Sequence, residues 1–400
     1  MTVEQKIAEW AATLAWSEIP ESTQQRVMTI HLDAVASGLA GAQLRLAEQA
    51  SGVAQRFAGE SPAAAAFARA YAITSATLCD VYRPGLCHVT PVVLPPLEAL
   101  GAAEDDPEFL AAFTVGLEVT TRLCVALDYP RLRSRGWHSP GVVGPVGAAA
   151  AVARLLGLDA DGVSNAMAHG AAQAAGTFAA LGTEAVKFNQ ARAAVAGLLA
   201  GLAAEAGLAA SPQWLTAVDG GMTAAYGGGP RPELLIRDLG KRWELERISL
   251  RRWPAASSVQ SLIEVCVELE VEADQVETVV IDLSPHGYEV SGDRGWETPL
   301  AAQQSARWVA ACTLLDRDWW LEHSTSARLL DPRTTELASR VRVNSSNEID
   351  GSGVRVRVRT RGGAEVRVER HDAPGDPERP LSRADVEAKL ARASSKVAVG

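Results

Sequence analysis

Two histidines in short loops are the residues of this 400-residue chain best suited to acid–base chemistry near neutral pH. His88 lies within Arg83–Pro91 and His138 within Arg135–Gly141, and each segment comes just before a predicted helix. Backbone N–H groups at a helix N-terminus favour anions, so a histidine there could exchange a proton with a bound anion. Taken singly, each histidine is more often an ordinary surface or capping residue.

Lys187 is a third candidate, because it begins a nearly all-apolar predicted helix, Lys187–Ala206. A cation at a helix start opposes the helix dipole, which indicates a functional cation. The alternative interpretation is a solvated helix start.

Charge and motif content exclude several classes of protein. Thirty-eight Lys and Arg residues against 48 Asp and Glu give a net charge of −10, which argues against a general nucleic-acid binder. No glycine-rich nucleotide loop follows a predicted strand, and neither HExxH nor GxSxG occurs. The five cysteines form no CxxC pair and the seven histidines are scattered, so the sequence predicts no metal site and no cofactor.

The cysteine count and the apolar stretches predict a cytoplasmic protein. An odd, scattered set of cysteines fits a reducing compartment. Met1–Trp16 carries charged residues where a secretory signal needs an apolar core. The most apolar stretch, Ala193–Ala210, contains Glu205 and is short for a bilayer span, so we expect a buried helix and no membrane association.

The elements that must position these residues fall into two regimes. In the first, Ala and Leu recur at three- and four-residue spacing, which predicts helices at Gln5–Trp16, Glu21–Leu39, Gln43–Gly59, Pro62–Cys79, Glu108–Asp128, Val142–Leu156 and Lys187–Ala206. Alanine at this density lets helices approach closely, which predicts a compact all-α bundle.

The second regime, from about Trp243, mixes strands and helices. Val276–Leu283 is β-branched at its centre, and Val354–Arg359 with Glu365–Glu369 predicts a hairpin. We interpret its arginine stripe as a solvated strand face rather than an anion site. Helical patterns intervene, and Ser382–Ala393 looks helical again, so this half is predicted to be α+β.

Short motifs run through the chain in a characteristic order. The most specific is Gly136-Trp137-His138-Ser139-Pro140, followed by Gly147–Ala150. Lys187 and Arg192–Ala194 come later, and Gln303–Trp308 lies further on. In this order the motifs resemble the MmgE/PrpD family, which includes 2-methylcitrate dehydratase, cis-aconitate decarboxylase and iminodisuccinate epimerase.

The resemblance implies a fold class, mainly α with a smaller α+β domain. A large all-α helical bundle would span residues 1–242, with residues 381–400 returning to it, and the inserted α+β lid would span residues 243–380. The resemblance also implies a homodimer and a cofactor-independent, metal-independent lyase, either dehydratase or decarboxylase, for a small di- or tricarboxylic acid. In such chemistry a base or acid moves a proton beside a carboxylate, and cations stabilise the developing charge.

By position, the resemblance assigns catalytic roles to His88, His138 and Lys187. We expect the two histidines to face each other across one cleft, with Lys187 and Arg251 supplying positive charge when the domains close on substrate. The implied substrate-binding residues are Asp80, Tyr82, Arg83, Arg192, Arg251 and Gln260.

Several positions depart from the family pattern. Leu78 and Tyr82 replace an acidic residue and a threonine, and Ala256 and Gln260 replace histidines. Arg251 replaces a lysine but keeps the charge. These departures leave the reaction open, and a nonstandard one in secondary metabolism is plausible. The alternatives are an isomerase or epimerase that uses the same site, and a non-catalytic homologue.

Overall fold

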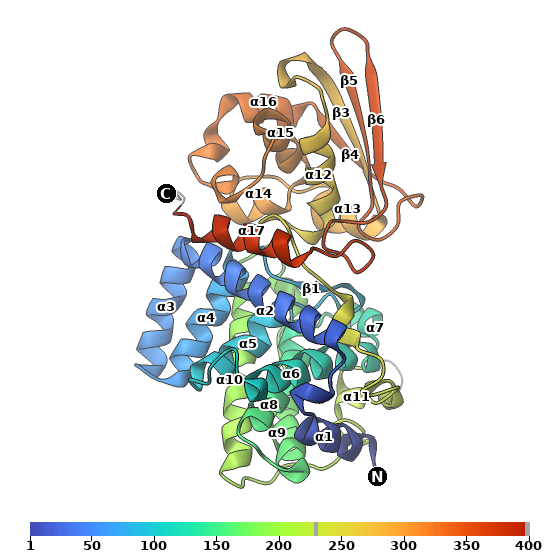
Figure 1. Cartoon of the computed structure of the whole chain (residues 1–400). Helices are drawn as coiled ribbons and strands as arrows, with labels where there is room; N and C mark the ends of the chain where they lie inside the picture. Colours follow the sequence, from blue (N-terminus) through green and yellow to red (C-terminus); the bar gives the residue numbers. More distant parts are fainter. Residues whose placement is uncertain (228–230, 397–400) are drawn as a thin grey trace. The chain divides into compact units, whose positions relative to one another are not determined.

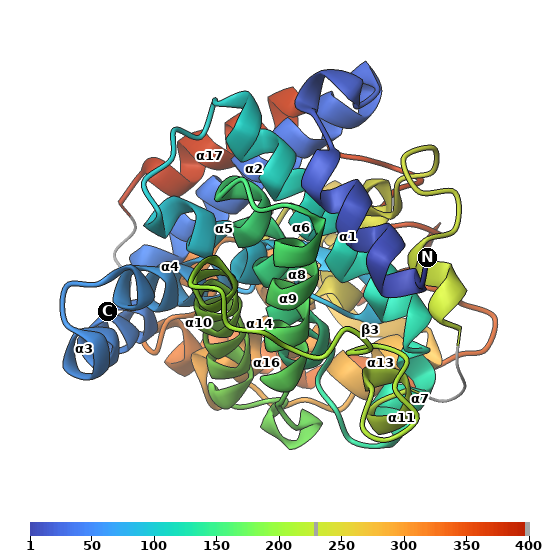
Figure 2. The same ribbon diagram turned by 90° about the horizontal axis from the view of Figure 1, so that it is seen from below.

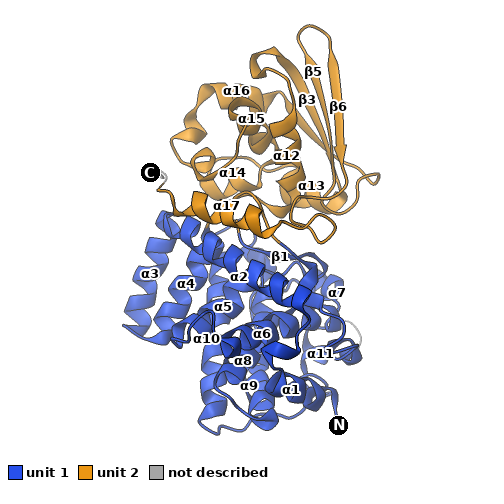
Figure 3. Cartoon of the chain, in the orientation of Figure 1, with its two compact units in different colours: residues 1–75, 79–249 blue, residues 76–78, 250–400 orange. Residues whose placement is uncertain are grey.

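A computed structural model describes residues 1–227 and 231–396, which fold into two compact units (Figures 1 and 3). Unit 1 comprises Met1–Ser75 and Cys79–Ser249, and unit 2 comprises Ala76–Leu78 and the chain from Leu250 onward. Unit 1 is almost entirely helical, whereas unit 2 combines helices with a four-stranded sheet. The predicted fold class, mainly α with a smaller α+β domain, is confirmed.

The helices of unit 1 are α1 (Val3–Thr13), α2 (Glu21–Ala42), α3 (Arg45–Ala58), α4 (Pro62–Ser75), α5 (Thr90–Ala99), α6 (Pro107–Ala126), α7 (Tyr129–Ser134), α8 (Ser139–Leu155), α9 (Ala160–Ala172), α10 (Ala185–Glu205) and α11 (Met222–Ala225). Two short strands, β1 (Val81–Tyr82) and β2 (Ile248–Ser249), form an antiparallel pair beside them. Each of the seven segments predicted to be helical overlaps one of these helices, with ends that differ by up to three residues or, for α4, which ends at Ser75 rather than Cys79, by four.

Helix α8 lies at the centre of unit 1, where α6, α9 and α10 pack around it (Figure 2). All its residues from Ser139 to Arg154 are buried. Glycine makes the close approaches possible: a Cβ at Gly147 would lie 1.8 Å from the Thr120 hydroxyl, and one at Gly197 would lie 2.2 Å from the Ala148 side chain. The small residues that predicted a tight bundle therefore set the helix spacing.

Two features of unit 1 differ from a simple reading of the sequence. Helix α5 forms although it contains Pro91, Pro95 and Pro96. Pro91 stands in the first turn, where its missing N–H costs nothing, whereas Pro95 and Pro96 lie inside the helix and leave it without two backbone donors. Among the described helices, α6 is the one long and apolar enough to cross a membrane, whereas the sequence had singled out Ala193–Ala210 as the most apolar stretch. In the most apolar 18 residues of α6, 94% are buried inside the protein. Burial of this kind is typical of a core helix.

Unit 2 is built on a sheet with strand order β4-β3-β5-β6, in which only the β3–β4 pair is parallel. The strand predicted at Val276–Leu283 and the predicted hairpin are confirmed. The elements are α12 (Gln260–Glu268), β3 (Val276–Leu283), α13 (Pro285–Ser291), α14 (Pro299–Gln304), α15 (Ala306–Asp316), α16 (Pro332–Ser339), β4 (Val341–Ser345), β5 (Val354–Thr360), β6 (Glu365–Arg370) and α17 (Arg383–Ser394).

The two faces of the sheet have opposite characters. Valines of β5 point into the core with α12 and α15, while its arginines point the other way. Arg355 forms ion pairs with Glu348 and Glu369 at 2.9 and 2.7 Å, and Arg359 pairs with Glu277 at 3.1 Å. Because these arginines meet carboxylates of the same unit, the stripe is a network of ion pairs on the outer face.

The boundaries of the units differ from the predicted ones. Unit 1 ends at Ser249, whereas the sequence predicted an end at residue 242. The reason is that β2 pairs with β1, which belongs to the helical bundle. Residues 381–396, the described part of the predicted 381–400 segment, group with unit 2, and their return to the helical bundle stays a prediction. The Lys389 ammonium on α17 donates to the carbonyls of Leu78 and Arg251 at 3.1 and 2.9 Å, and both residues are in unit 2. These buried bonds tie the last helix to unit 2.

Candidate active site

The backbone of His138 is held by a second loop of unit 1. The His138 N–H donates to the Gly176 carbonyl at 3.0 Å, and the Phe178 N–H donates to the Gly136 carbonyl at 2.7 Å. Gly176 has φ +115°, which residues with a side chain rarely adopt. These contacts fix His138 as the residue that caps the N-terminus of α8.

Arg192 holds the same pair of loops from the side of α10. Its guanidinium donates to the carbonyls of Gln173, Ala175 and Gly141 at 2.9, 3.0 and 3.1 Å. Burial is the largest influence on the pKa of Arg192, and it lowers that pKa. The guanidinium is engaged with backbone and positions the His138 loop, and its contact with substrate stays a prediction.

The His138 imidazole is buried and only weakly engaged. Its Nδ1 atom lies 3.5 Å from Asn189 Nδ2, at the limit of a hydrogen bond, and its ring centre lies 6.4 Å from that of Phe178. Among the described residues, Nε2 has no hydrogen-bond partner in the structure. The ring can therefore accept a further polar partner.

Lys187, on the first turn of α10, is buried rather than solvated. Its ammonium donates to the Thr74 carbonyl on α4 at 2.7 Å. A buried ammonium is costly unless its charge is compensated. The alternative interpretation of a solvated helix start is wrong, and the lysine is a buried cation on the same helix as Asn189.

Electrostatics keep His138 neutral at neutral pH. Burial, and secondarily the nearby Lys187 charge, lower the pKa of His138 from 6.5 to about 4. The imidazole therefore carries a basic nitrogen at pH 7. An anion bound beside Lys187 would offset that positive charge and raise the pKa of His138 again.

His88 is held by Asp80, as the two residues form one local structure. The His88 Nδ1 atom lies 2.6 Å from the Asp80 carbonyl oxygen. A carbonyl only accepts hydrogen bonds, so Nδ1 carries the proton and Nε2 is the basic nitrogen of the neutral ring. The Asp80 carboxylate accepts from the N–H groups of Val89 and Thr90 at 2.8 and 3.0 Å, and from the Thr90 hydroxyl.

The charge state of Asp80 reflects two opposing effects. Complete burial raises the pKa of this carboxyl, while the bonds from Thr90 and Val89 lower it. Because the carboxylate faces the start of α5, it satisfies backbone donors that have no partner inside the helix. Asp80 thus positions the residues that follow His88.

The two histidine loops touch each other within unit 1. The Ser139 hydroxyl, one residue after His138, is within hydrogen-bonding distance of the Gly85 and Leu86 carbonyls, at 2.6 and 3.0 Å. The structure thus brings together the backbone around both predicted histidines. That their rings face each other across one cleft stays a prediction.

Tyr82 and Arg83 open the loop that leads to His88. Tyr82 is buried, and its hydroxyl donates to the Glu244 carboxylate at 2.8 Å. Burial, reinforced by Glu244, raises the pKa of Tyr82. Because this hydroxyl is engaged inside unit 1, Tyr82 anchors the loop. Arg83 starts a short 3-10 turn and is half-buried, and its contact with substrate stays a prediction.

Arg251 and Gln260 lie in unit 2, whereas the histidines and Lys187 lie in unit 1. The Gln260 amide oxygen accepts from the N–H groups of Arg252 and Trp253, both at 3.1 Å, and its nitrogen donates to the Trp253 carbonyl at 3.0 Å. This amide is used by the backbone, so Gln260 shapes the segment that follows Arg251. That Arg251 contributes its charge to the same site as His88, His138 and Lys187 stays a prediction.

Two residues of the His138 site were not predicted from the sequence. Asn189 approaches the imidazole from α10, and the Tyr226 ring packs edge-on against Trp137 with centres 5.1 Å apart. The Tyr226 hydroxyl also donates to the Ala174 carbonyl at 2.8 Å. Asn189 lies two residues after Lys187, but only the fold shows that its side chain meets His138.

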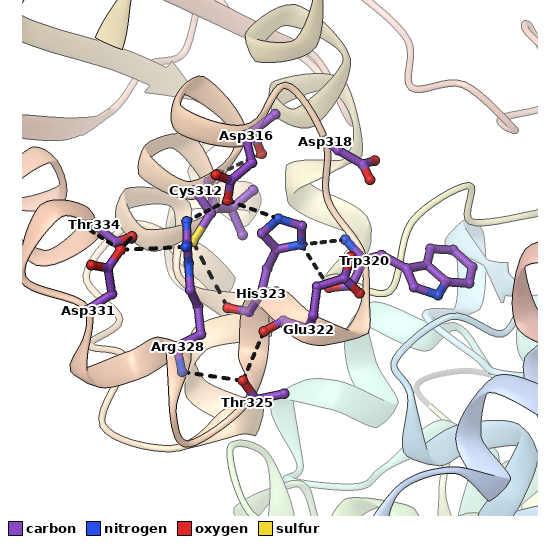
Figure 4. Close-up of polar contacts among 12 residues, drawn as sticks. Cys312, Asp316, Asp318, Trp320, Glu322, His323, Thr325, Arg328, Asp331 and Thr334 are labelled. Atoms are coloured by element: carbon purple, nitrogen blue, oxygen red, sulfur yellow. Dashed lines mark hydrogen bonds and ion pairs between the residues drawn. The ribbon is translucent and has the colours of Figure 1, made fainter. Parts of the chain in front are cut away.

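A second buried histidine, His323 in unit 2, belongs to a polar cluster with different properties (Figure 4). Its Nδ1 atom accepts from the Trp320 N–H at 2.8 Å, and its Nε2 lies 3.2 Å from the Asp316 carboxylate. Arg328 also contacts Asp316, and its guanidinium lowers the pKa of the Cys312 thiol. Burial is the larger effect and raises that thiol pKa to about 12, so Cys312 is not a nucleophile at neutral pH.

Comparisons with known proteins cover nearly the whole chain. The model of the MmgE/PrpD N-terminal domain matches residues 5–235, and that of the C-terminal domain matches residues 253–399. The chain is 27% identical to the cis-aconitate decarboxylase-like protein oryM of Aspergillus oryzae, over 87% of this chain and 80% of that protein. It is 26% identical to a cis-aconitate decarboxylase of Aspergillus terreus, over 88% of this chain and 80% of that protein. It is also 26% identical to the cis-aconitate decarboxylase of Homo sapiens, over 84% of this chain and 73% of that protein.

Proposed function

This chain belongs to the MmgE/PrpD family, and on that premise we propose that it is a cofactor-independent lyase that decarboxylates a small tricarboxylic acid. The observation that carries the proposal is the buried, neutral imidazole of His138 beside the buried cation of Lys187. The names of its relatives favour decarboxylation over dehydration.

Lys187 recognises the substrate by charge. Its ammonium is buried and donates to the Thr74 carbonyl, so an incoming carboxylate would meet a cation that is shielded from bulk water. Attraction between opposite charges is stronger away from bulk water. The N-terminus of α8, which begins next to His138, adds a favourable dipole for the same anion.

His138 moves the proton once the anion is bound. Substrate charge raises the pKa of the imidazole, which lets the ring hold the proton that it later gives away. In the proposed step the bond between carbon and the leaving carboxylate breaks, and its electron pair passes into the conjugated carbon framework. A carbon atom of that framework takes the proton from the imidazolium, and CO2 leaves. Lys187 stabilises the negative charge in between.

His88 is the partner in proton transfer. Its Nδ1–H bond to the Asp80 carbonyl fixes the ring so that Nε2 is the basic nitrogen. The contact between Ser139 and the 85–86 carbonyls supports a shared site for the two histidines. The experiment below tests whether His138, as proposed, or His88 delivers the proton to carbon.

The test is a turnover assay with cis-aconitate and related di- and tricarboxylic acids, in which CO2 release and substrate loss are both followed. We expect release of one CO2 per substrate consumed. His138→Asn should lower turnover by about a hundredfold or more, while His286→Asn, a change of a half-exposed histidine in unit 2, should not. The pH dependence of kcat in His88→Asn and His138→Asn separates the acid from the base.

Other outcomes distinguish the alternative functions. Loss of water without CO2 indicates a dehydratase. Uptake of deuterium from solvent into recovered substrate, without loss of substrate, indicates an isomerase or epimerase. Absence of both turnover and thermal stabilisation by every acid contradicts enzymatic function and indicates a non-catalytic homologue.

We also propose that the enzyme is a homodimer that works in the cytoplasm. Support comes from the family resemblance and from an apolar patch on unit 1, where Val53, Phe57 and Phe188 are 50%, 54% and 45% exposed. Phe67 joins the two aromatic residues, with ring centres 5.5 and 5.7 Å away. Sedimentation should give twice the 42.2 kDa chain mass, and Phe57→Asp should shift it towards the monomer. A monomer in the unmodified protein contradicts the dimer.

A further inference from the structure

Unit 1 contains a second basic site, away from the residues assigned to catalysis. A cavity of about 250 Å³ opens between the end of α6 and the segment from residue 231 to residue 244. Four arginines and two glutamates contribute to its walls: Arg122, Arg231, Glu233, Arg237, Arg242 and Glu244. The lining therefore carries an excess of positive charge on a chain whose net charge is −10.

Arg122 builds this cavity and is not available to a ligand. Its Nε contacts the Glu118 carboxylate at 2.5 Å, and its other nitrogens donate to the carbonyls of Leu235, Arg237 and Arg242. These bonds hold the 235–242 segment around the cavity. The side chain is completely buried, so the frame of the site is fixed before any ligand arrives.

The guanidinium groups of Arg237 and Arg231 are available to bind an anion. Within residues 1–227 and 231–396, the Arg237 side chain takes part in no hydrogen bond or ion pair. Arg231 has only a long contact of 3.8 Å with Asp128, and its side chain is 58% exposed. Guanidinium groups bind carboxylate and phosphate oxygens in pairs of parallel hydrogen bonds. Two such groups on a preformed cavity suit an anion with two charges.

The opposite wall is connected to the His88 loop. Glu244 is buried and shares its carboxylate among Arg242, Arg247 at 3.3 Å and the Tyr82 hydroxyl at 2.8 Å. The backbone of Tyr82 exchanges two hydrogen bonds with Cys87, at 2.8 and 3.1 Å, directly before His88. An anion that draws Arg242 away from Glu244 leaves the carboxylate more fully to Tyr82, which tightens this loop.

We propose that the cavity lined by Arg231, Arg237 and Arg242 binds a small dianion with carboxylate or phosphate groups, and that binding is transmitted through Glu244 and Tyr82 to the His88 loop. The site is separate from Lys187 and His138, so it adds a regulatory ligand to the molecule. Its binding does not depend on the proposed lyase reaction.

Calorimetry tests the binding with two probes, inorganic phosphate and succinate, on the full chain without turnover. At least one probe should bind, and Arg237→Gln should weaken its binding to this site tenfold or more. Arg56→Gln is the matched control, because it removes an exposed arginine of α3 that forms no hydrogen bond or ion pair with any described residue. This variant should bind as the unmodified protein does. A preference for phosphate or for succinate identifies the group that the ligand carries. Equal binding by Arg237→Gln and the control, or no binding of either probe, overturns the site.

Hydrogen exchange tests the connection to the His88 loop. Saturation with the bound probe should slow amide exchange in residues 82–88 of the unmodified protein, and Arg237→Gln should lose this protection. Exchange that does not change on binding overturns the connection, although the calorimetric site stands. Because neither measurement uses catalysis, a failure of the proposed function does not affect either result.

Discussion

His138 in unit 1 and His323 in unit 2 are both buried, yet their surroundings prepare them for different tasks. Both ring nitrogens of His323 are occupied, one by the Trp320 N–H and one by the Asp316 carboxylate. His138 has one contact at 3.5 Å and a cation, Lys187, as its charged neighbour. The contacts of His323 join parts of its own unit and so stabilise the fold, whereas the His138 ring, which has an open nitrogen and a cation nearby, can interact with a ligand. The predictions below test this distinction.

The largest effect is expected from the histidine of unit 1. His138→Asn should lower kcat by about 10²- to 10⁴-fold, the usual contribution of a general acid or base. The circular dichroism spectrum should be unchanged, since no strong hydrogen bond of the ring is lost. His286→Asn is the control. A variant that keeps more than a tenth of the activity would remove His138 from the reaction.

The histidine of unit 2 should affect stability rather than catalysis. His323→Ala leaves the buried Trp320 N–H without its acceptor and the Asp316 carboxylate without one of its partners. Such losses typically cost about 2–4 kcal/mol of the free energy of unfolding. Denaturant titration measures this cost, and kcat of the folded fraction should remain within a few-fold. A large loss of kcat with normal stability would reverse the roles assigned to the two histidines.

The pH dependence of stability should carry the signature of His138. Its pKa is lowered on folding, from 6.5 to about 4, so the unfolded chain binds more protons between these values. The free energy of unfolding should therefore fall as pH decreases from 6.5 to 4, with a contribution of about 3 kcal/mol from this residue. Comparison with His138→Asn isolates that contribution, because other titrating groups are common to both proteins. Parallel stability curves would show that the imidazole is not held neutral.

The smallest effect concerns the cation beside the ring. Lys187→Met should raise the pKa of His138, because the lysine charge is the second cause of its depression. Burial is the larger cause and remains, so the pKa should stay below 6.5. A titration followed by NMR of the imidazole ring measures the shift. An unchanged pKa would separate Lys187 from His138 electrostatically.

Local features of this protein could be predicted from its sequence. Apolar spacing is a property of the chain itself, so it located seven of the eleven described α-helices of unit 1, the strand Val276–Leu283 and the hairpin of β5 and β6. The helix predicted at Ser382–Ala393 was likewise local, and the structure confirms it as α17, which begins with a capping box at Ser382. The order of the motifs identified the family, because motif order survives when single positions change.

Only the tertiary structure decided what the polar residues do. The sequence marked Arg192, Tyr82 and Gln260 as substrate contacts, which stays a prediction, and the fold shows that all three also bond to backbone or to Glu244. It also placed α17 in unit 2, because Lys389 finds its carbonyl partners there. The physical reason is that apolar periodicity is encoded within one element, whereas burial, hydrogen bonding and pKa depend on neighbours distant in the chain. His138 is an ordinary histidine in the sequence, and burial with Lys187 beside it makes it neutral.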